Sequence, residues 1–109
     1  AIVSRAVSPT NPVDINPIVI DTWFMSEIRS ARYMVQVVNG SAPNEKVDVI
    51  NYVVTHANGT VYGNEIDRFS TDSSLGDLSV AVNAGFVELS FTGAGAGNNV
   101  KMSKTYITV

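Results

Sequence analysis

The chain holds a single histidine, His56, which by type is the residue best suited to act as a general base or a metal ligand. Either role needs partners at fixed positions, and no G-x-S-x-G, H-E-x-x-H or phosphate-loop motif accompanies it. His56 instead comes just before Asn58-Gly59, and an Asn-Gly step is a strong short-range signal for a β-hairpin. We therefore predict that His56 is a turn or packing residue. We expect no catalytic residues and no enzyme activity.

The other residues that could carry chemistry lack the spacing that a site needs. Asp67, Asp72 and Asp77 are five residues apart, whereas a calcium loop takes its oxygen ligands from alternate positions. The chain has no cysteine, which excludes disulfides, thiolate metal sites and cysteine nucleophiles. The sequence predicts no metal and no cofactor.

Four residues are candidate contact residues. Phe86 lies on the polar face of a predicted strand and beside a turn, whereas the other aromatic residues are expected mainly in the core. Pro9, Pro12 and Pro17 are three of the four prolines, and all fall in the first 17 residues. Each proline fixes φ, removes a backbone donor and pushes its predecessor toward extended geometry. We therefore interpret residues 1–16 as an extended N-terminal arm that can lie on a neighbouring molecule.

The composition predicts a folded domain and argues against nucleic acid and membranes as partners. Of the 109 residues, 45% are hydrophobic and 16% are charged, which predicts one folded domain rather than a disordered chain. The seven lysines and arginines are scattered and the net charge is −3, so no basic stripe is available for nucleic acid. No apolar run approaches 18 residues, so we predict no membrane contact.

From residue 17 onward the pattern is that of an all-β domain. Short segments with a period of two alternate with turn signals, and most turns are short enough for hairpins. The sequence predicts about seven strands in a mainly antiparallel sandwich, jelly-roll or immunoglobulin-like, over residues 17–109. The expected strands are 18–24, 32–38, 47–54, 61–69, 77–82, 87–91 and 100–109. Residues 25–30 are compatible with one helical turn. The alternation slips in 100–109, which predicts a bulge there or burial on both faces.

Several short motifs follow one another along these predicted strands. They are Arg29-Ser30-Ala31-Arg32-Tyr33 with Val35-Gln36-Val37, Val53-Val54-Thr55-His56 with Asn58-Gly59-Thr60, Tyr62-Gly63, Ser74-Leu75-Gly76, and Gly85-Phe86-Val87-Glu88-Leu89. In this order and spacing, from about Asp21 to Val109, the chain resembles a β-domain that recurs in virion structural proteins of T4-like tailed bacteriophages of marine and cyanobacterial hosts. It departs from that pattern by an inserted Ala57 and by the glycine-rich tip at 93–97.

The resemblance implies a non-enzymatic virion protein of the tail, neck, baseplate, fibre or capsid surface. It also implies a homo-oligomer, a trimer or a hexamer, that meets other virion proteins, and it carries over no catalytic residues. The extended arm suits this role, because an extended segment can add hydrogen bonds along an exposed sheet edge.

A second hypothesis is a host-surface or carbohydrate-binding module of a tail fibre. Such a module would bind a host glycan through loops such as 39–46, 70–77 and 93–98, because binding residues concentrate on loops over a rigid scaffold. These loops contain no cluster of aromatic residues on which a sugar could stack.

Overall fold

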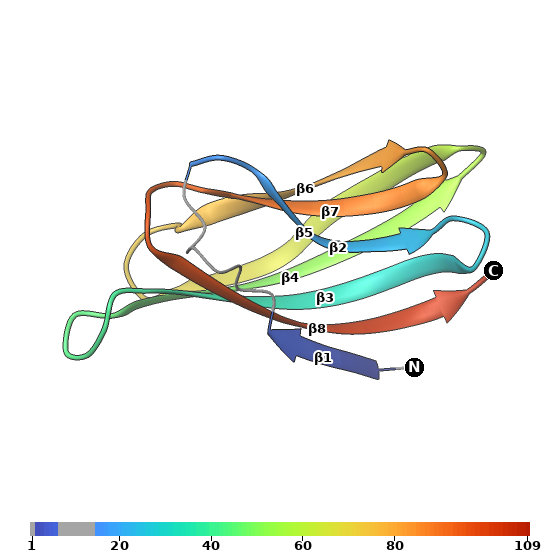
Figure 1. Cartoon of the computed structure of the whole chain (residues 1–109). Helices are drawn as coiled ribbons and strands as arrows, with labels where there is room; N and C mark the ends of the chain where they lie inside the picture. Colours follow the sequence, from blue (N-terminus) through green and yellow to red (C-terminus); the bar gives the residue numbers. More distant parts are fainter. Residues whose placement is uncertain (1, 7–14) are drawn as a thin grey trace.

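The computed structural model describes residues 2–6 and 15–109, and within them the chain forms eight strands in two sheets (Figure 1). The strands are β1 (Ile2–Ala6), β2 (Ile18–Phe24), β3 (Ile28–Asn39), β4 (Lys46–Ala57), β5 (Thr60–Ser70), β6 (Gly76–Asn83), β7 (Phe86–Gly93) and β8 (Asn98–Thr108). One sheet has the order β1-β8-β3-β4-β5 and the other the order β2-β7-β6. The strand pairs are antiparallel, which confirms the predicted all-β sandwich.

Two tight hairpins set the order of the strands, and both were predicted from the sequence. Asn58 and Gly59 join β4 to β5 with φ angles of 54° and 79°, and Ala84 and Gly85 join β6 to β7 with φ angles of 51° and 81°. Two successive residues with positive φ make the turn whose twist matches that of the flanking strands.

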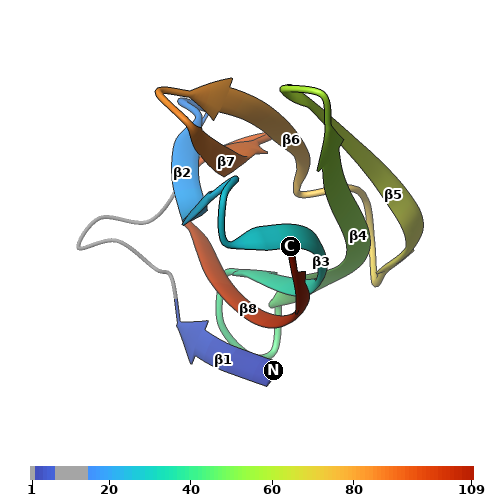
Figure 2. The same cartoon turned by 90° about the vertical axis from the view of Figure 1, so that its right-hand side faces the viewer.

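The core lies between the two sheets and follows the period-two pattern. Figure 2 looks along the strands and shows the larger sheet curving around one side of the smaller one. Alternate residues of β3 and β7 are completely buried: Tyr33, Val35, Val37, Val87, Leu89 and Phe91. β2, β4 and β8 complete the core with Ile20, Trp23, Ile50, Tyr52, Val54, Val100 and Met102.

The N-terminal segment contributes an edge strand that the sequence pattern did not predict. β1 pairs with β8 from Ile2↔Thr105 to Ala6↔Lys101, so residues 2–6 extend the larger sheet. Pro9 and Pro12 lie outside the described residues, and the division of the chain at residue 16 stays a prediction.

One local prediction is wrong, and another is right only about the position of an irregularity. Residues 25–27 form a turn and β3 begins at Ile28, so there is no helical turn at 25–30. β8 keeps a regular alternation, and Ile107 is 68% exposed, so residues 100–109 are not buried on both faces. The irregularity lies on the partner strand, where Arg29 is an extra residue between the pairs Ile28↔Thr108 and Ser30↔Ile107.

Among the described residues, no helix has the length and apolar character needed to cross a membrane.

Candidate interaction surface

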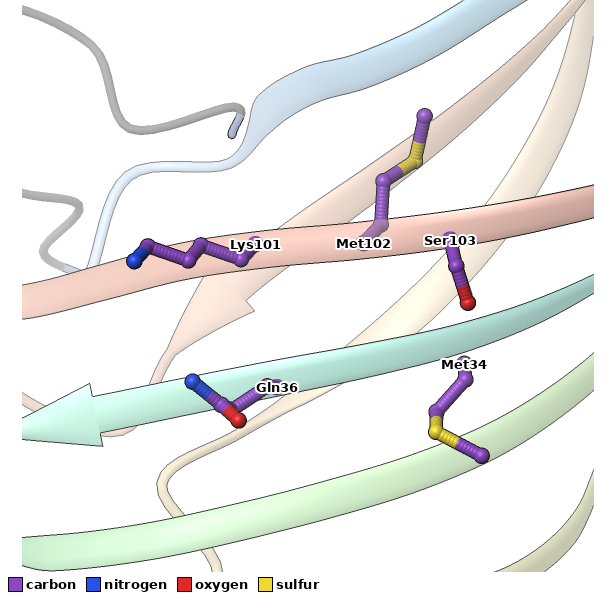
Figure 3. Close-up of a pocket in the computed structure, with 5 residues that line it drawn as sticks. All are labelled: Met34, Gln36, Lys101, Met102 and Ser103. Carbon is purple, nitrogen blue, oxygen red and sulfur yellow. The ribbon is translucent and has the colours of Figure 1, made fainter. Parts of the chain in front are cut away.

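The outer face of the larger sheet, on the side away from the core, carries a line of shallow hollows along β3 and β8. Figure 3 shows one of them, of about 190 Å³, where Met34 and Gln36 of β3 lie beside Lys101 and Ser103 of β8. Three further hollows of about 290–410 Å³ continue along the same two strands. They are lined by Ser30, Ala31, Arg32, Met34, Gln36, Val38, Asn51, Val53, Asn99, Lys101, Ser103, Thr105 and Ile107. We call this surface the β3–β8 face.

Strand register explains why these residues come together. Arg32 of β3 lies opposite both Val53 of β4 and Thr105 of β8. Two residues further along β3, Met34 repeats this arrangement with neighbours on the same two strands. Because alternate residues of a strand share one face, such rows form a continuous surface from segments far apart in the sequence.

The side chains of the β3–β8 face are both polar and apolar. Arg32, Gln36 and Lys101 supply hydrogen-bond donors, and Met34, which is 51% exposed, supplies an apolar contact. None of the residues that line these four hollows is a histidine, aspartate or glutamate. The face therefore offers contacts for a ligand or a protein but no side chain that would act as a general acid or base near neutral pH.

Strand β5 adds large exposed apolar side chains next to this face. Tyr62, Ile66 and Phe69 are 57%, 51% and 72% exposed, and β5 is the outermost strand on its side of the sheet. Phe69 lies opposite the partly buried Val49 of β4. An exposed edge strand with apolar side chains is a typical site of protein–protein contact.

The predicted contact residue Phe86 belongs to an aromatic pair on the smaller sheet. Phe86 lies directly opposite Phe24, and their ring centroids are 4.1 Å apart at an interplanar angle of 31°. Phe24 is 46% exposed, whereas Phe86 is half-buried. Pro17 is exposed and comes just before β2, so these two predicted contact residues lie at opposite ends of β2. Sequence reasoning missed Phe24, because only the register of β2 and β7 pairs it with Phe86.

His56 is a packing residue, as predicted. It is 6% exposed, and its Nε2 atom lies 2.7 Å from the Ile28 carbonyl oxygen. Its ring centroid lies 5.8 Å from that of Trp23. The contact with Ile28 holds the start of β3 against the end of β4, and the contact with Trp23 packs the same ring against β2.

A buried polar cluster joins the two sheets and was not predicted. Lys104 Nζ lies 2.9 Å from Asp21 Oδ2, and the Tyr33 hydroxyl donates to the same oxygen at 2.7 Å. The Trp23 indole donates to the Tyr33 hydroxyl at 2.8 Å. All four side chains are buried, and Asp21 reaches the interior through a bulge in β2 between Val19 and Asp21. The period of two in β8 placed Lys104 inward beside Met102, which was the one signal for this cluster.

A second buried cluster fixes the connection between β5 and β6. Asp48 is completely buried and accepts hydrogen bonds from Arg68 Nη1 at 2.7 Å, Ser70 Oγ at 2.7 Å and the Leu75 amide at 3.1 Å. Burial acts to lower the pKa of Arg68, but its hydrogen bond to Glu65 and the charges of the nearby carboxylates outweigh burial and raise the pKa. The cluster holds the connection between β5 and β6 in place.

The aspartates considered as calcium ligands have separate partners. Asp67 accepts a hydrogen bond from Asn51 at 2.6 Å, and Asp72 pairs with Lys46 at 3.1 Å. Asp77 pairs with Arg68 at 3.1 Å. In the part of the chain that the structure describes, no three side chains of metal-binding type gather in one place.

Solved structures with a similar fold come from bacteriophages. The tailspike protein of Acinetobacter phage vB_ApiP_P1 matches 98% of this chain with a TM-score of 0.61 and 14% identity. The tailspike protein of Acinetobacter baumannii phage AM24 matches 99% of it with a TM-score of 0.50 and 10% identity. The matched regions are 21% and 26% of those two proteins. At these identities the likeness establishes a shared fold.

No protein-family model and no curated protein matches the sequence.

Proposed function

We propose that this chain is a non-enzymatic structural domain of a bacteriophage virion that works through protein–protein contacts. The observation that carries the proposal is the fold shared with a phage tailspike protein over 98% of the chain. That match covers 21% of the tailspike. It therefore supports a role as one domain of a tail-related protein, and the proposal does not include the activity of the whole tailspike. We propose that the chain lies in the tail, neck, baseplate, fibre or capsid surface of the particle. The resemblance to the T4-like phage domain is part of the basis for this proposal.

The exposed surfaces support an assembly role. Phe69 and Tyr62 on β5 and Phe24 on the smaller sheet are about half exposed or more, and side chains of this kind can pack against another protein. We propose that the partners are further copies of this chain, in a trimer or a hexamer, and other virion proteins.

Particle fractionation and light scattering test the proposal. Antibodies against the chain should label purified virions at one structure, and the isolated chain should have three or six times the mass of one copy. Absence of the chain from purified virions would contradict the virion role. A monomeric mass at all accessible concentrations would contradict the homo-oligomer.

The β3–β8 face also favours a second candidate function, the binding of a host glycan. Arg32, Gln36 and Lys101 can donate hydrogen bonds to sugar hydroxyls from a face lined with hollows. The loop at 93–98 is a weaker candidate, because the amide of Asn39 holds it through Ala96 and Asn98 at 2.8 and 3.0 Å.

A glycan array tests this second function. We would expect selective binding that Lys101→Ala abolishes, with Lys46→Ala as the control at an exposed lysine whose partner is Asp72. No binding on a broad array of bacterial surface glycans, or binding unchanged by Lys101→Ala, would exclude the β3–β8 face as the site.

A further inference from the structure

Strand β1 occupies a position that a strand from another molecule could equally fill. Its ladder is made with one strand, β8, between Ile2↔Thr105 and Ala6↔Lys101. Figure 2 shows β1 beyond β8, on the far side from β4 and β5. An antiparallel ladder consists of backbone hydrogen bonds, so β1 from a second copy would form the same ladder in the same register.

In this structure the edge of β8 is covered by β1. Without β1, the backbone donors and acceptors of residues 101–105 would form an open edge of the kind that pairs with other chains. Directly behind this edge lie Met102, 4% exposed, and Lys104, 8% exposed, whose ammonium group pairs with Asp21. Loss of the edge strand would bring water closer to this buried ion pair, which costs stability.

The sequence that connects β1 to the rest of the domain is rich in proline. Residues 7–17 lead from β1 in the larger sheet to β2 in the smaller one, and they include Pro9, Pro12 and Pro17. Prolines restrict both themselves and their predecessors to extended backbone, and proline-rich connections act as semi-rigid spacers. A fully extended connection of this length spans up to about 40 Å, enough to reach a neighbouring domain.

We propose that β1 of one copy pairs with β8 of a second copy of this chain in the register Ile2↔Thr105 to Ala6↔Lys101. This inference rests on the proposed homo-oligomer and names the contact that builds it. Exchange of β1 around a closed ring would cover every β8 edge, because each copy gives one strand and receives one.

Engineered cysteines test the exchange, and the chain suits this test because it has no cysteine of its own. Ser4 and Ser103 are direct partners in the β1–β8 ladder, and partner residues in such ladders lie within disulfide distance. Ser4→Cys chains and Ser103→Cys chains, one of them carrying a size tag, would be co-expressed and oxidised. We expect a disulfide that joins one chain of each kind. The double variant Ser4→Cys/Ser103→Cys should give covalent species up to the size of the oligomer.

A matched pair within one sheet provides the control. Ser79 of β6 and Ser90 of β7 are also direct partners, but a tight hairpin joins their strands. Ser79→Cys and Ser90→Cys on separate chains should give no mixed product, and together on one chain they should give an internal disulfide.

The outcomes separate this inference from the proposed function. An oligomer in which Ser4→Cys/Ser103→Cys gives internal disulfides alone would overturn strand exchange and leave the assembly role standing. A monomeric mass by light scattering would overturn the homo-oligomer together with the exchange, whereas the virion role is contradicted by absence of the chain from purified virions. Disulfides that join Ser4→Cys chains to Ser103→Cys chains would establish the exchange, provided that Ser79→Cys and Ser90→Cys on separate chains give no mixed product.

Discussion

At the scale of single residues, the buried polar groups of this domain hold the fold together. Asp48 accepts three hydrogen bonds. Asp21 pairs with the Lys104 ammonium group and accepts a hydrogen bond from the Tyr33 hydroxyl. Buried charges persist in proteins when they are paired in this way, because an unpaired buried charge is very costly. Tyr52 is a milder case, since burial and the charge of Glu65 both raise the pKa of its hydroxyl.

The raised pKa of Tyr52 predicts a loss of stability in base. Below pH 10 the hydroxyl is protonated in the folded and unfolded chains alike, and the stabilisation is fully present. As the pH rises from 10 through the higher folded-state pKa, the unfolded chain loses its proton first, so the free energy of unfolding falls by at most about 1.4 kcal/mol per pH unit. Tyr52→Phe should reduce this fall in urea titrations between pH 8 and 11. Tyr62→Phe, which removes the hydroxyl of an exposed tyrosine, serves as the control. An identical pH dependence in both variants would contradict this account.

At the scale of elements, the sequence pattern predicts strands well where each strand buries one face. β3 and β7 show this most clearly, because their inward residues are completely buried at alternate positions. The sequence pattern did not predict β1, because this strand is defined by its pairing with β8, about a hundred residues away in the sequence. The bulges at Ile20 in β2 and at Arg29 in β3 were also missed, because a bulge is defined by the partner strand.

The start of β6 depends on a close approach that requires glycine. A Cβ atom at Gly76 would lie 2.4 Å from Phe91 Cζ and 2.4 Å from the Thr92 carbonyl oxygen. The backbone oxygen cannot move without disturbing the β6–β7 ladder, so we expect Gly76→Ala to lower the free energy of unfolding by about 1–3 kcal/mol. Gly95→Ala is the control, because a Cβ atom there would meet nothing within 4 Å. Chemical denaturation of the two variants provides the comparison, and equal midpoints would show that β6 tolerates the added atom.

At the scale of the whole molecule, the exposed surfaces were the hardest feature to predict. The sequence predicts Phe86, Pro9, Pro12 and Pro17 as contact residues, and this stays a prediction. The β3–β8 face combines residues of three strands that lie up to about 75 positions apart. Alternation indicates which residues point outward, but it leaves open which of them are neighbours, because that is set by the register between strands. The same limit hid the cluster of Asp21, Tyr33 and Lys104, which joins the two sheets.

Because Lys104 links β8 to β2 across the interior, its loss should weaken the whole sandwich. Lys104→Met keeps most of the length of the side chain but leaves the buried Asp21 carboxylate without its ammonium partner. Removal of one member of a buried ion pair typically costs about 3–5 kcal/mol, and we expect a loss of this size in the free energy of unfolding. Lys101→Met, on the exposed face of the same strand, should change it by less than about 0.5 kcal/mol. The double variant Asp21→Asn/Lys104→Met should recover part of the loss, because it removes the unpaired charge. Equal stability of Lys104→Met and Lys101→Met in urea unfolding would mean that the ion pair does not join the sheets.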